Sequence, residues 1–142
     1  MSSTTTHSLP STPARGLHVA LWGVQGLLGL AFLLAGVMKS TQPIETLGQN
    51  MPWALAVPPA LVRVIGVSEL LGALGLVLPS ALRVAPKLTP LAAAGLVLVM
   101  ALAGAFHATR GELGALPINL VLGGLAAFVA WGRLQAAPIA GR

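Results

Sequence analysis

Four long apolar runs, separated by short stretches that hold most of the charges, constrain the fold most strongly. They lie at about residues 17–38, 61–79, 88–108 and 116–132. A helix needs about 20 apolar residues to cross a hydrocarbon core of about 30 Å. The sequence therefore predicts an all-α fold, a polytopic membrane protein built as a bundle of four transmembrane helices.

The composition supports a membrane protein and excludes several other classes. Hydrophobic residues make up 56% of the chain and charged residues 8%, whereas soluble domains carry about 25% charged residues. The net charge of +5 does not indicate a nucleic-acid partner, because the basic residues are scattered and no basic patch with interleaved aromatic residues is present. The chain has no cysteine, which excludes thiolate chemistry, and its three histidines are too widely spread to predict a metal site.

The boundaries of the membrane domain and its two tails follow from the positions of the apolar runs. Residues 1–16 are rich in Ser, Thr and Pro and are expected to form a disordered cytoplasmic tail, residues 17–133 a four-span domain, and residues 134–142 a second cytoplasmic tail. The first run is longer than a signal-peptide core of about 7–15 residues, and no convincing cleavage site follows it, so we expect it to be retained.

The distribution of basic residues predicts the orientation. Five of them lie in the two tails and the connection at 80–87, and two lie in the other two connections. Cytoplasmic segments carry an excess of Lys and Arg, so both termini are predicted to be cytoplasmic, in a multi-pass protein of the cell inner membrane.

The second run contains the segment at residues 63–79, which holds an acid at membrane depth. Charges there are expensive and usually face a protein interior or a wet cavity. Helical spacing places Glu69 on one face with a set of small and apolar residues: Val62, Gly66, Gly72, Ala73 and Leu76. Small faces let transmembrane helices approach closely, so Glu69 is expected to point into the bundle.

The other polar residues are predicted to gather in the outer half of the bundle. Lys39 closes the first span, Arg63 opens the second and His107 closes the third, while Gln25 is the main polar residue of the inner half. The proline-rich connection at 40–60 is expected to lie in the interface or to fold over the bundle as a lid. The predicted site residues are Glu69 and His107, as acid–base groups, and Lys39, Arg63, Arg110, Glu112, Asn119 and Trp53, as ligand-binding groups.

Two interpretations of this cluster stay open. It is either an ion-pair network that fixes helix register or a site for a ligand with a polar head and an apolar tail. For Lys39 alone, a further interpretation is a lysine at the helix end that reaches only the membrane interface. A quinone or another lipid would place its head at His107, Arg63 and Glu69 and its tail among apolar side chains.

Several segments resemble the DoxX-like family of small four-helix membrane proteins. They are LAGVMK, RVIGVSELLGALGLVLP, LTPLAAAGLVLVMALAGAFHATRGE and INLVLGG, which together extend over residues 17–133. The resemblance implies a subunit of a membrane oxidoreductase system, since the namesakes of the family look like subunits of a thiosulfate:quinone oxidoreductase. It favours Lys39, Arg63, Glu69, His107, Arg110, Glu112 and Asn119 as functional positions.

The function expected is therefore that of an accessory or quinone- or lipid-binding subunit of a membrane oxidoreductase system. The alternative is a stand-alone membrane enzyme that acts on a small lipophilic substrate, with Glu69 and His107 as acid–base groups. A transporter would require an oligomer, because four short spans leave little room for alternating access. Expected partners are the lipid bilayer, oxidoreductase subunits and further copies of the chain, and a quinone is the one cofactor considered.

Overall fold

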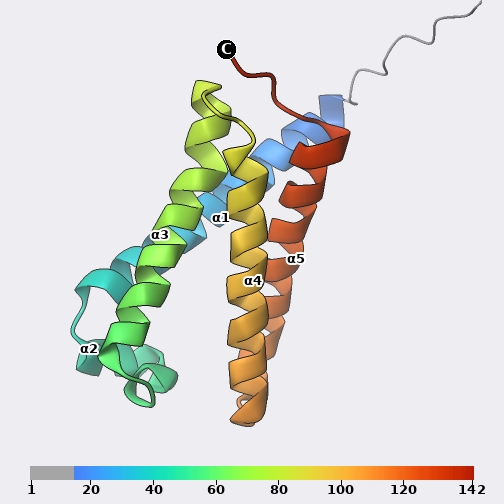
Figure 1. The fold of residues 1–142 in the computed structure, drawn as a ribbon. Helices are drawn as coiled ribbons and strands as arrows, with labels where there is room; N and C mark the ends of the chain where they lie inside the picture. The colour runs from blue at the N-terminus through green and yellow to red at the C-terminus, as the bar shows by residue number, and fades with distance from the viewer. Residues whose placement is uncertain (1–14) are drawn as a thin grey trace, which may run out of the picture.

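The computed structural model describes residues 15–142, so most of the predicted N-terminal tail lies outside the described residues. Within that range every regular element is helical (Figure 1). The elements are α1 (Arg15–Thr41), α2 (Ile44–Asn50), η1 (Pro52–Leu55), α3 (Pro59–Leu82), α4 (Leu88–Thr109), η2 (Leu113–Ala115), α5 (Leu116–Trp131) and the π-helical turn η3 (Gly132–Ala136).

Four helical segments are long and apolar enough to cross a membrane, as the sequence predicts. They are Arg15–Thr41, Pro59–Leu82, Leu88–Thr109 and Leu113–Ala136. Many of their large apolar side chains are exposed on the outside of the bundle, Leu71, Leu98 and Leu120 among them. Water would make such a surface costly, whereas acyl chains solvate it. The protein is therefore a multi-pass membrane protein.

The second span does not end at Pro79 as predicted, because α3 continues to Leu82. Proline lacks the N–H that would bond to the carbonyl four residues earlier, and its ring disturbs that turn. The side chain of Gln25 on α1 donates a hydrogen bond of 2.6 Å from Nε2 to the carbonyl oxygen of Leu76, in the affected turn. The carbonyl that loses its donor to Pro79 is that of Gly75, so the bond from Gln25 ties α1 to the neighbouring carbonyl of the same turn.

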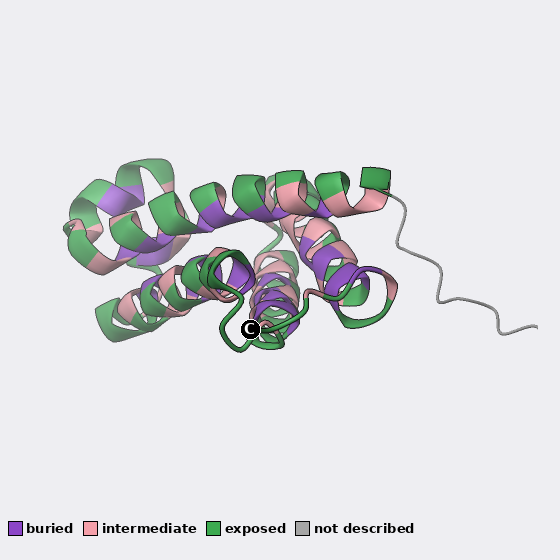
Figure 2. Ribbon diagram, turned by 90° about the horizontal axis from the view of Figure 1, so that it is seen from above, coloured by how far each residue is buried: buried purple, intermediate pink, exposed green. Residues whose placement is uncertain are grey.

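The helices form two packed pairs, α1 with α3 and α4 with α5, and α3 also packs on α4 (Figure 1). Seen along the bundle, the buried residues of α1 face the other helices and its exposed residues face outward (Figure 2). A core of apolar side chains from all four helices fills the middle: Leu28, Phe32, Ala73, Leu76, Ala93, Leu96, Met100, Ala126 and Val129. The face predicted for Glu69 is confirmed, since all of its residues are buried.

Two glycines allow α1 and α3 to approach closely. A Cβ built on Gly36 would lie 2.8 Å from the carbonyl oxygen of Gly66 and 2.9 Å from the backbone nitrogen of Leu70. A Cβ on Gly66 would meet Ser40 and Lys39 at 2.7–2.9 Å. Contact at this distance brings the end of α1 against α3 and places Lys39 beside the middle of α3.

The connection between α1 and α3 folds against the end of this helix pair (Figure 1). Its helices α2 and η1 bury Leu47 and Ala54 in a small second core together with Val62 of α3. This packing agrees with a segment that folds over the bundle and does not span it. It brings Trp53 to the end where α1 finishes and α3 begins, which we call the Lys39 end.

Candidate functional site

A buried ion pair lies near the Lys39 end. Nζ of Lys39 lies 2.7 Å from Oε1 and 2.8 Å from Oε2 of Glu69, and the two residues are 8% and 2% exposed. The interpretation of Lys39 as a residue that reaches only the membrane interface is therefore wrong. The carboxylate of Glu69 is deep in the bundle, and pairing with it stabilises both charges better than separation would.

A second charged group lies where α4 ends. Nδ1 of His107 lies 2.6 Å from Oε2 of Glu112, and Nε of Arg110 donates to Oε1 at 2.7 Å. Hydrogen bonds from His107 and Arg110 lower the pKa of Glu112 below its usual 4.5. Since a carboxylate only accepts hydrogen bonds, Nδ1 of His107 carries a proton, which leaves its Nε2 for another partner.

Trp53 lies between these two charged groups. Its ring centroid is 6.0 Å from Nζ of Lys39 and 6.3 Å from the ring centroid of His107, and its ring meets that of Phe106 edge to face at 6.4 Å. One side chain of the folded connection thus touches both helix pairs. This position explains why α2 and η1 matter for the site, although they lie outside the four spans.

Between the helix pairs lies a cavity of about 1000 Å³. This volume is at the upper end of the range of about 300–1,000 Å³ that is typical of ligand pockets. Its walls are mainly apolar, and its polar lining comes from Lys39, Ser68, Glu69, His107, Glu112, Asn50 and Asn119. Trp53 and Phe106 also line it.

Asn119 is the polar group of this cavity without a partner. Its amide nitrogen Nδ2 is fully buried and makes no hydrogen bond within the described part of the chain. A buried donor left unpaired costs about 1–3 kcal/mol, and a ligand recovers this energy if the Asn119 side chain turns its nitrogen toward the cavity.

Two of the predicted ligand-binding residues do not line the cavity. Nη1 of Arg63 donates to the backbone carbonyl of Lys39 at 2.6 Å and so caps the end of α1. Arg110 is exposed, and its guanidinium lies 5.4 Å from the ring centroid of Phe106. The structure thus brings together Lys39, Glu69, Trp53, His107, Glu112 and Asn119, while Arg63 and Arg110 support the residues around them.

Sequence analysis missed a polar cluster at the opposite end of the bundle. Arg133, expected at the edge of the second tail, is 4% exposed, and its Nε donates to Oε1 of Gln25 at 2.6 Å. Its guanidinium carbon lies 5.3 Å from the centroid of the Trp22 ring, and Nη1 lies 3.2 Å from Nδ1 of His18. Gln25 shares a helical face with buried residues of α1, and this spacing could have indicated that Gln25 is buried. Nothing in the sequence indicated that its partner is Arg133, 108 residues away.

Comparison with known proteins identifies the family. No curated protein and no solved structure matches the chain. The model of the DoxX-like family matches residues 23–129, about three quarters of the chain, and this range contains α3 and α4 and most of α1 and α5. The chain therefore belongs to the DoxX-like family.

Proposed function

We propose that the protein binds a lipophilic molecule with a hydrogen-bonding head, of the quinone class, as a subunit of a membrane oxidoreductase system. The observation that carries this proposal is the large cavity with mainly apolar walls and a few polar lining residues, among them Asn119, whose amide nitrogen has no partner within the described residues. A quinone carbonyl accepts hydrogen bonds, and a quinone tail suits apolar walls. When bound, a quinone supplies electron and proton transfer, while the chain itself supplies the site that holds its head.

Two further groups support a head site at this end of the cavity. Nε2 of His107 is a second group, besides the Asn119 amide, that can engage a ligand. Because Nδ1 donates to Glu112, Nε2 can accept a hydrogen bond from the hydroxyl of the reduced quinone. Trp53 offers a flat aromatic surface that a quinone ring can stack on, and it also lines the cavity.

The arrangement favours an accessory role over a stand-alone enzyme. Both carboxylate oxygens of Glu69 accept hydrogen bonds from Lys39. The carboxylate of Glu112, which holds His107, also accepts a hydrogen bond from Arg110. Groups engaged in this way are poorly placed for acid–base work on a substrate, whereas they fix the walls of a binding site. We further propose that both termini lie in the cytoplasm and that the protein resides in the inner membrane, as the basic residues indicate.

Fluorescence of Trp53 tests the binding. In a background with Trp22→Phe and Trp131→Phe, Trp53 is the only tryptophan. A ubiquinone with a one-isoprenoid tail should quench it saturably in detergent micelles. Asn119→Leu should weaken binding about three- to tenfold, the effect of losing one hydrogen bond of about 0.5–1.5 kcal/mol.

The matched control is Asn50→Leu, the same exchange at an amide that also lines the cavity but is exposed. Because water satisfies that amide, its loss should leave the affinity unchanged. Absence of saturable quenching in the parent protein, or equal affinities in the Asn119 and Asn50 variants, would contradict the proposal.

A further inference from the structure

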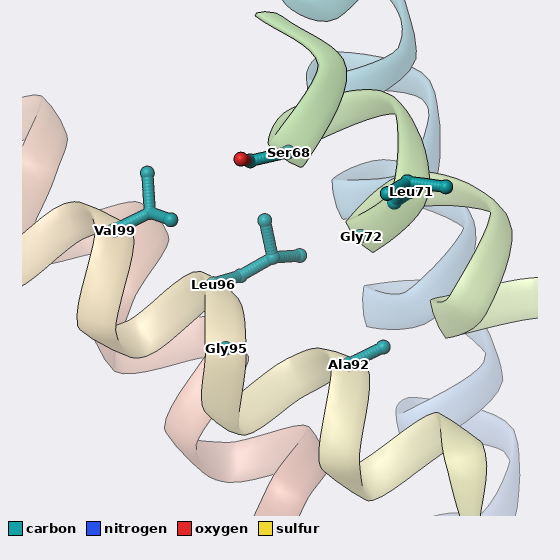
Figure 3. A pocket seen from close by; sticks show the side chains of 7 residues that line it. All are labelled: Ser68, Leu71, Gly72, Ala92, Gly95, Leu96 and Val99. Atoms are coloured by element: carbon teal, nitrogen blue, oxygen red, sulfur yellow. The ribbon is translucent and has the colours of Figure 1, made fainter. Parts of the chain in front are cut away.

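A second hollow of about 350 Å³ lies between α3 and α4 (Figure 3). It is lined by Ser68, Leu71, Gly72, Ala92, Gly95, Leu96 and Val99. Six of these seven residues have no polar side-chain atom, and the hydroxyl of Ser68 donates to the carbonyl of Val64 in its own helix. The hollow therefore suits an apolar group and offers no partner to a polar one.

This groove adjoins the large cavity. Ser68 of α3 and Val99 of α4 line both hollows, so they form the common wall. In Figure 3, Ser68 and Val99 both point into the space between the two helices. Glu69 and Met100, the next residue on each helix, line the cavity alone. The side chains of Ser68 and Val99 are therefore what a molecule in the cavity would have to pass to enter the groove.

The far part of the groove opens on the outside of the bundle. Gly95 is exposed, and a Cβ built on it would have no atom within 4 Å. Leu71 across from it is 65% exposed. In a membrane protein this apolar surface faces acyl chains, so the groove opens sideways to the hydrocarbon core of the bilayer.

We propose that the groove between α3 and α4 holds the apolar tail of the ligand and lets it run from the cavity into the bilayer. This inference rests on the proposed function and narrows the ligand to molecules with a long isoprenoid or acyl tail. Twelve residues of α4 separate His107 from Gly95, which corresponds to about 18 Å at 1.5 Å per residue. A tail must exceed roughly this length to leave the protein at Gly95.

The variant Gly95→Phe tests the groove, because a Cβ at this position meets no atom within 4 Å and the side chain adds bulk to the lining. Binding is measured by quenching of Trp53, in the background with Trp22→Phe and Trp131→Phe, with two ubiquinones that carry one and ten isoprenoid units. The matched control is Gly124→Phe on α5, which is also exposed and open but lines neither hollow.

We expect Gly95→Phe to weaken binding of the long-tailed quinone about tenfold or more, equivalent to about 1.4 kcal/mol. Binding of the short-tailed quinone should be unchanged, and Gly124→Phe should affect neither. If both quinones bind Gly95→Phe as they bind the parent protein, the groove holds only bulk lipid and the inference is wrong, while the proposed function stands. If neither quinone binds the parent protein, the proposed function fails and the inference fails with it.

Discussion

At the scale of single residues, the protein has very few acidic side chains, and those in its interior are paired with basic groups. The chain holds three: Glu69 pairs with Lys39, Glu112 with His107 and Arg110, and Glu45 is exposed on α2. Each buried or half-buried carboxylate thus has a specific basic partner. In a bundle surrounded by lipid, removal of one partner leaves a charge that water cannot reach.

Glu69→Gln should therefore destabilise the protein by about 3–5 kcal/mol, because it leaves the ammonium of Lys39 buried without its counter-ion. Unfolding in a denaturing detergent, followed by circular dichroism, measures the loss. The double variant Lys39→Met with Glu69→Leu should recover most of it, and Glu45→Gln is the matched control at an exposed acid. A Glu69→Gln protein as stable as the control would show that the pair contributes little.

Glu112 should give stability a defined pH dependence. Its pKa is lowered in the folded protein, so its contribution is complete above the unfolded value near 4.5 and is lost as pH falls through the folded pKa. The melting temperature of Glu112→Gln should lie below that of the parent protein at neutral pH, and the difference should shrink below pH 4.5. A difference that stays constant with pH would rule out this linkage.

At the scale of elements, the two helix pairs are held by different devices. Glycines bring α1 and α3 into backbone contact near the Lys39 end, whereas a polar cluster joins α1 to the end of α5 at the other. The cavity lies where the pairs diverge. Its shape therefore depends on both devices, although neither Gly36 nor Arg133 lines it.

Gly36→Ala should cost about 1–3 kcal/mol, the range for overpacking a tight contact, because the added methyl meets backbone atoms that cannot rotate away. Gly23→Ala on the same helix is the control, since its position is open and exposed. That exchange should be neutral or stabilising by about 0.5–1 kcal/mol. Equal stability of the two variants in detergent unfolding would refute the close contact.

Gln25→Leu should destabilise the bundle by about 1–3 kcal/mol, because it removes the acceptor of Arg133 and the donor to Leu76. The double variant Gln25→Leu with Arg133→Leu should be more stable than Gln25→Leu alone, since no buried guanidinium then lacks a partner. Thermal unfolding of the two variants in one detergent makes this comparison. If the second exchange adds to the loss, Arg133 is held mainly by its other contacts.

At the scale of the whole molecule, the ends of the bundle differ in charge. Arg15, Arg83, Lys87, Arg133 and Arg142 lie at the end away from Lys39, where none of the three acids is found. The opposite end combines all three acids with Lys39, Arg63 and Arg110. This asymmetry supports the proposed orientation, in which the basic end lies in the cytoplasm.

Cysteine labelling tests the orientation without background, because the natural chain has no cysteine. In intact cells, a membrane-impermeant maleimide should label Gly114→Cys. It should label Gly16→Cys and Gly141→Cys only after permeabilisation, since these exposed positions lie at the basic end. The reverse pattern would place the termini outside and overturn the predicted orientation.

The sequence by itself determined the four spans, their membrane environment and the inward face of Glu69. Length and hydropathy decide whether a segment spans a bilayer, and helical periodicity decides which residues share a face. These are local properties of the chain. These properties did not give the end of α3, which continues past Pro79 to Leu82.

Only the tertiary structure decided which polar groups meet. It gave Glu69 the partner Lys39 and not Arg63, and it joined Gln25 to Arg133 at the other end of the bundle. It also left the amide nitrogen of Asn119 without a partner among the described residues. Beside the cavity that Asn119 lines, it formed the groove that reaches Gly95. Residue types and spacing within one helix cannot supply this information, because a pairing between helices depends on their crossing angle, register and distance, which the packing of all four helices sets together.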